Sequence, residues 1–105
     1  MKNLIAEAPS VAEAFFALTA SIRERSVLLP KQNELILIGI FTASKAMKGL
    51  VTHITRALEA GANKDEIISA IVLALPITGI ANVNMALDTA LETIQSYERD
   101  RAVCS

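Results

Sequence analysis

Apolar residues recur every three or four positions along this 105-residue chain, which is the period of an α-helix. In the first such stretch, Val11, Phe15, Leu18 and Ile22 fall on one helical face. No alternating apolar and polar run is bounded by hairpin turns, so the pattern contains no strand signal. We therefore predict an all-α fold of about five helices, in a single domain over residues 1–105 with a core over about 9–99.

Prolines, glycines and capping residues set the predicted boundaries. Ser10 and Glu13 have the spacing of a capping box, as do Asn63 and Glu66, so each pair is expected to begin a helix. Pro76 is expected to end one. The predicted helices cover Ser10–Arg25, Pro30–Ala43, Ser44–Ala60, Lys64–Leu75 and Gly79–Arg99. The predicted apolar stripes of the third and fifth are Met47, Val51, Ile54 and Leu58, and Ile80, Val83, Leu87, Leu91 and Ile94.

Hydrophobic residues make up 52% of the chain, and its mean hydropathy is +0.43, which is high for a small domain with much surface. The longest apolar runs, such as "LILIGIF", are far shorter than the ~20 residues of a membrane span. The N-terminus carries an acid and lacks the long apolar segment of a signal peptide. We therefore predict a cytoplasmic protein, without a membrane segment, that buries surplus apolar surface as a homo-oligomer.

The charges argue against several other classes of function. The formal net charge is −1 and the two signs are interspersed, so no basic patch predicts a nucleic-acid partner. The single cysteine, Cys104, cannot form an intramolecular disulfide or a cysteine-based zinc site. We expect neither a metal nor a cofactor.

The only histidine, His53, is the first candidate for chemistry. If the chain turns near residues 42–44, the flanking helices form an antiparallel hairpin, and counting from the turn places Glu34 opposite His53. A buried carboxylate needs a partner, and beside an imidazole it favours the charged ring and fixes its orientation. Three interpretations remain open: an acid–base pair, a purely structural pair, or a Glu34 that simply lies in the first turn of its helix, where the helix dipole favours an acid. Gly49, one turn before His53, is expected to leave open space beside Ile38 and Phe41.

Three segments, "LPKQNEL", "HITRALEAGANKDEI" and "AIVLALPITGIANVNMAL", resemble the carboxymuconolactone decarboxylase and alkylhydroperoxidase D-like proteins over roughly Pro9 to Ala90. The peroxidase-like branch carries Cys-x-x-Cys-x-x-x-His, with a glutamate twelve residues before the first cysteine. Glu34 and His53 occupy the matching positions here, but Ala46 and Gly49 replace the two cysteines. Disulfide chemistry needs a thiolate and a resolving thiol, so the peroxidase mechanism is not expected to carry over.

The resemblance implies a trimer or hexamer, and a likeness to the decarboxylase branch, which lacks the dithiol and keeps the histidine. We interpret Glu34 and His53 as candidate catalytic residues. Lys48 and Gly49 are candidate substrate-binding residues, with Lys48 and the helix start holding a small-molecule carboxylate. Two alternatives remain: a non-catalytic oligomeric scaffold or binding protein, and, less favoured, a thiol-dependent peroxidase that uses Cys104.

Overall fold

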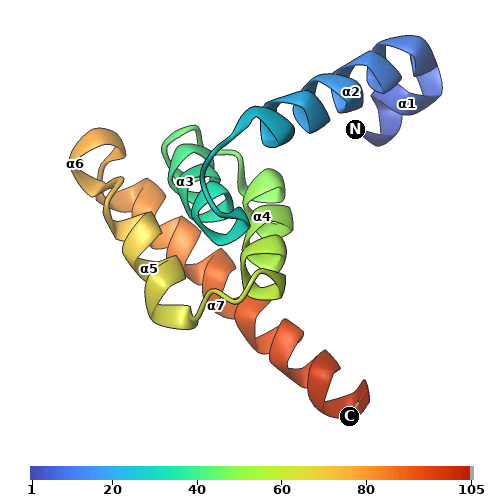
Figure 1. Ribbon diagram of the computed structural model, residues 1–105. Helices are drawn as coiled ribbons and strands as arrows, with labels where there is room; N and C mark the ends of the chain where they lie inside the picture. Colours follow the sequence, from blue (N-terminus) through green and yellow to red (C-terminus); the bar gives the residue numbers. More distant parts are fainter. Residues whose placement is uncertain (105) are drawn as a thin grey trace.

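The computed structural model describes residues 1–104, and of Cys104 the backbone alone. The described chain is helical and contains no strand, which confirms the all-α prediction. Figure 1 shows a body of packed helices from which the first two helices project as an arm. The helices are α1 (Lys2–Glu7), α2 (Pro9–Arg25), α3 (Pro30–Ala43), α4 (Met47–Glu59), α5 (Lys64–Val72), α6 (Leu75–Thr78) and α7 (Ile80–Cys104).

The predicted start of the first long helix is wrong. No side chain caps α2, which begins at Pro9 with Ala8 in the N-cap position. Proline suits the first helical position, because its missing N–H would have no intrahelical partner there. Ser10 therefore lies inside the first turn, and the preceding helix α1 was not predicted at all.

The boundaries in the middle of the chain are partly as predicted. Asn63 does cap α5: its side chain accepts from the Glu66 N–H at 2.8 Å, and the Glu66 carboxylate accepts from the Asn63 N–H at 3.0 Å. Pro76 does not end that helix, because α5 stops at Val72 and Pro76 lies in the first turn of the short helix α6. Residues 44–46 form a turn before α4, in which Lys45 has a φ of 61°.

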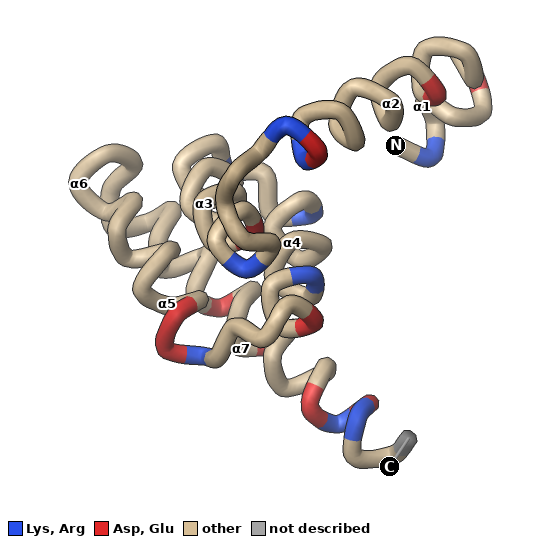
Figure 2. The backbone as a smooth tube through the Cα atoms, viewed as in Figure 1, with Lys and Arg blue, Asp and Glu red and all other residues tan. Residues whose placement is uncertain are grey.

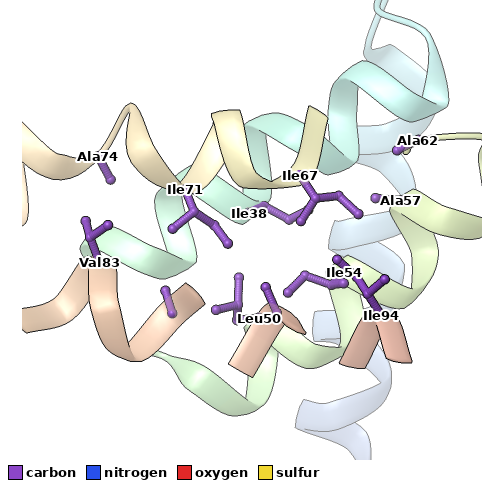
Figure 3. Close-up of a cluster of buried hydrophobic side chains, with 12 residues drawn as sticks. Ile38, Leu50, Ile54, Ala57, Ala62, Ile67, Ile71, Ala74, Val83 and Ile94 are labelled. Carbon is purple, nitrogen blue, oxygen red and sulfur yellow. The ribbon is translucent and has the colours of Figure 1, made fainter. Parts of the chain in front are cut away.

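The core lies between α3, α4, α5 and α7, as Figure 3 shows. Small residues contribute more to it than the predicted stripes suggest. In α4 the chain buries Leu50 and Ala57 with Ile54, while Val51 stays 41% exposed. The buried apolar residues are Ile38, Leu50, Ile54, Ala57, Ala62, Ile67, Ile71, Ala74, Val83, Ala86, Ala90 and Ile94.

The arm of α1 and α2 leaves a large surface uncovered. The accessible area is 7209 Å², whereas a folded monomer of 11.2 kDa is expected to expose about 5,700 Å². The radius of gyration is 14.7 Å, against about 12.9 Å for a compact domain of 105 residues. The single chain is therefore more open than a compact domain of its size.

No helix within residues 1–104 is long and apolar enough to cross a bilayer.

Candidate functional site

Glu34 and His53 meet across the contact between α3 and α4. The Glu34 Oε2 atom lies 2.6 Å from His53 Nδ1. Glu34 is only 6% exposed, so its carboxylate is buried. An ionised carboxylate can only accept hydrogen bonds, so the imidazole donates through Nδ1–H in this pair. The short distance is typical of a charge-assisted hydrogen bond.

The local sequence explains how Glu34 reaches this position. The N–H of Leu29 donates to the Gln32 side chain at 3.0 Å, and Pro30 is the first residue of α3. The helix therefore begins early enough for Glu34 to lie beyond its first turn, which contains no acid. A role for Glu34 in the first turn of the helix, considered from the sequence, is thus wrong.

A second cation, which the sequence did not single out, also binds this carboxylate. Arg23, near the end of α2, places Nη2 3.2 Å from Glu34 Oε1. Each carboxylate oxygen of Glu34 thus has one basic partner. The only sequence signal for Arg23 was the basic last turn of α2. Helical periodicity does not show how the four-residue connection between α2 and α3 orients one helix on the other, so it could not place Arg23 beside Glu34.

The second nitrogen of His53 is not fully buried. Nδ1 is the ring nitrogen that has a hydrogen bond among the described residues. No buried side-chain nitrogen or oxygen in that part of the chain lacks a partner. Nε2 must therefore reach the accessible surface, although the side chain as a whole is only 13% exposed. The carboxylate holds one edge of the imidazole, and the other edge can exchange a proton.

The expectation of open space beside Gly49 is wrong, because the ring of Phe41 fills it. A Cβ atom added at Gly49 would lie 2.4 Å from Phe41 Cε1 and 2.8 Å from Cδ1. The same ring stacks on His53, with the centroids 4.8 Å apart and the planes 20° apart. Gly49 thus admits the aromatic ring that covers one face of the imidazole.

Lys48 is exposed in the first turn of α4, and it has no ion pair within residues 1–104. His53 lies five positions further along the chain, which corresponds to about 140° around the helix. The structure therefore places Lys48 and His53 on different faces of α4, and Arg23 is the cation that lies beside Glu34.

A cavity of about 700 Å³ opens on the far side of α3, between α3, α5 and α6, and neither Glu34 nor His53 lines it. The side chain of Cys104 lies outside the described residues. No group of three His, Cys, Asp or Glu side chains in the described chain could hold a metal ion.

Comparison with known proteins agrees with the resemblance noted in the sequence. Residues 9–92 match the sequence model of the Carboxymuconolactone decarboxylase family. No curated protein matches the chain.

Proposed function

Because the chain belongs to the carboxymuconolactone decarboxylase family, we propose that it is a proton-transfer enzyme acting on a small carboxylated, lactone-like metabolite. The observation that carries this proposal is the 2.6 Å contact between buried Glu34 and His53, whose other ring nitrogen reaches the surface. The contact fixes the ring and leaves one nitrogen for chemistry, as general acid–base catalysis requires.

The charges around the pair favour an anionic substrate. With the imidazole protonated, His53 and Arg23 carry two positive charges against the single negative charge of Glu34. The excess positive charge is partly shielded from water. In such a position it attracts an anion more strongly than it would in bulk solvent. Arg23, with a side chain 42% exposed, is the better candidate to hold a substrate carboxylate, and Lys48 is the weaker one.

The proposed reaction needs no electron acceptor. The bond between the substrate carbon and its carboxylate breaks, CO₂ leaves, and the electron pair moves into the neighbouring carbonyl or double bond. The proton on His53 Nε2 is then transferred to the substrate carbon, and water reprotonates the ring. Glu34 stabilises the imidazolium before the transfer, because its carboxylate bonds Nδ1–H. Phe41 covers a face of the ring and not the edge that carries Nε2, so its stacking is compatible with this step.

The test is CO₂ release from carboxymuconolactone, measured for the wild type and for matched substitutions. His53→Gln should lower kcat by about 100-fold or more, in the range of a lost general acid. Glu34→Gln should lower kcat less, because the ring keeps a neutral partner. Arg23→Gln should raise KM, whereas Lys48→Gln should have little effect. Turnover that persists unchanged in His53→Gln would refute the proposal.

A second candidate is a non-catalytic scaffold or binding protein, and the packing of Phe41 favours it. The ring fills the space at Gly49 and leaves His53 only 13% exposed. On this account Glu34→Gln and His53→Gln change the melting temperature, and neither changes the binding or turnover of any carboxylic acid. The same set of variants therefore separates the two candidates.

A further inference from the structure

We propose that the α2 helix of each chain docks into the groove between α3, α5 and α6 of a second copy of the same chain. The occupant is the apolar face of α2, formed by Val11, Phe15, Leu18 and Ile22. The receiving surface is the 700 Å³ cavity on the far side of α3 from Glu34. This inference is independent of the chemistry proposed for His53.

The helix that would dock has an apolar face without a partner in its own chain. Val11, Phe15, Leu18 and Ile22 are between 45% and 59% exposed, although they share one face of α2. Ala12, by contrast, is buried in the arm, where α1 packs against α2. In Figure 1 the arm points away from the body. An apolar helical stripe of this kind normally faces a core or a partner.

The groove that would receive it is apolar and extended. Leu73 is 78% exposed and Ile77 81% exposed on its α5–α6 wall, and Ile36 and Ile40 are about half exposed on the α3 wall. Gly39 also lines this groove, and a Cβ atom added to it would lie 3.4 Å from the carbonyl oxygen of Ala70 in α5. Figure 2 shows no charged residue on α6 or along the second half of α3. Such a surface fits a helix with large apolar side chains, as in helix-in-groove recognition.

The arm of the same chain cannot cover this groove while the site described above is intact. Arg23 ties the end of α2 to Glu34. Ile36 and Ile40 lie about 160° and 120° around α3 from Glu34, because each residue advances a helix by about 100°. Moving α2 onto that face would break the Arg23–Glu34 ion pair. A second copy can supply the helix without breaking it.

The accessible surface area of the single chain agrees with an exchange of α2 between copies. The single chain exposes about 1,500 Å² more than a compact monomer of its mass. A standard interface buries about 800 Å² on each partner. A chain that both gives an arm and receives one would bury about twice that share, which matches the surplus. Repeated use of one arm and one groove is a head-to-tail contact, which closes into a ring where the rotation between successive copies allows it.

Charge gives the docked helix a direction. Arg25 ends α2, and Asp65 lies at the start of α5 where the groove begins. Glu66 beside it already binds Lys31 at 3.0 Å, but Asp65 has no ion pair in the described chain. We therefore orient the C-terminal end of α2 toward Asp65 and its N-terminal end toward Ile77.

Two experiments test this contact. In a Cys104→Ser background, a tagged chain with Phe15→Cys and an untagged chain with Ile40→Cys are expressed together and treated with a short bis-maleimide. The expected product joins one tagged and one untagged chain. Ala17→Cys, on the opposite face of α2, is the matched control and should give much less. Equal coupling by the control, or coupling only within a single chain that carries both cysteines, would overturn the proposal.

The second experiment measures mass by light scattering at micromolar concentration. The wild type should give a multiple of 11.2 kDa. Phe15→Asp should shift the population toward 11.2 kDa, and Ala17→Asp should not, with helix content checked by circular dichroism. Phe15 is 45% exposed in the single chain, so its loss should leave the body folded. A wild type that stays at 11.2 kDa would overturn the inference.

Discussion

Replacing Gly49 by alanine should destabilise the protein, although alanine normally favours a helix over glycine by about 1 kcal/mol. The new Cβ would lie 2.4 Å from Phe41 Cε1, whereas carbon atoms in contact are usually about 3.5 Å apart. The ring must therefore retreat by roughly 1 Å, and overpacking of this kind costs about 1–3 kcal/mol. Loss of the stacking on His53 adds about 0.5–1.5 kcal/mol.

Together with the gain of about 1 kcal/mol in helix propensity, these effects give a net loss of about 0.5–3.5 kcal/mol in the free energy of unfolding. For a domain of this size, 1 kcal/mol lowers the melting temperature by about 4–8 °C. The assay is thermal and urea unfolding at one fixed protein concentration, because association would shift the apparent stability. The single histidine provides a second readout, since displacement of Phe41 should move its NMR ring signals.

Phe41→Leu supplies the internal control for this prediction. Leucine lacks the ring atoms that the Cβ would strike, so Gly49→Ala in that background should be neutral or stabilising by up to about 1 kcal/mol. The double-mutant cycle should therefore give a coupling energy of about 0.5–4.5 kcal/mol, which is the difference between the loss in the wild type and the neutral or stabilising effect in the Phe41→Leu background. A Gly49→Ala protein at least as stable as the wild type, with unmoved histidine signals, would refute the packing described for Phe41.

Three further predictions follow from other parts of the chain. Asn63→Ala should lower the free energy of unfolding by about 1 kcal/mol in urea titrations, because α5 loses its cap. The hydrogen bond from the Asn63 N–H, and then the bond to Lys31, lower the pKa of Glu66 below its ordinary 4.5, so its stabilising effect is present above that pH and is lost as the pH falls through the lowered pKa. Glu66→Gln should therefore lower the melting temperature near neutral pH, with a gap that narrows below pH 4.5. With Ala46 and Gly49 at the dithiol positions, peroxide turnover with a dithiol reductant should be trivial, and robust activity lost in Cys104→Ser would contradict this.

The sequence predicted the features that depend on local rules. Asn63 and Glu66 form the cap that their spacing indicates. Counting from the turn at residues 42–44 placed Glu34 opposite His53, and the two side chains do meet at 2.6 Å. The family also followed from quoted segments, and the match over residues 9–92 confirms it.

The sequence did not predict the features that depend on helix packing and on side-chain direction. Alanines add little to a hydrophobic pattern, yet Ala86 and Ala90 are fully buried on α7, while Leu91 stays partly exposed. Small side chains let helices approach closely, and periodicity alone does not reveal which face does so. The sequence placed Phe41 beside Gly49, but the residue pattern could not show that its ring fills the space there.

The most direct test of the central claim is ¹H–¹⁵N NMR of the single imidazole, in the wild type and in Glu34→Gln, with and without carboxymuconolactone. The account predicts a proton held on Nδ1 by Glu34 in the wild type, an Nε2 that exchanges with water, and a shift of the Nε2 signals on adding the acid. It also predicts that Glu34→Gln weakens the Nδ1 hydrogen bond. A ring that carries a proton on Nε2 and none on Nδ1, or histidine signals that neither Glu34→Gln nor the acid changes, would contradict the claim that Glu34 and His53 form a proton-transfer pair.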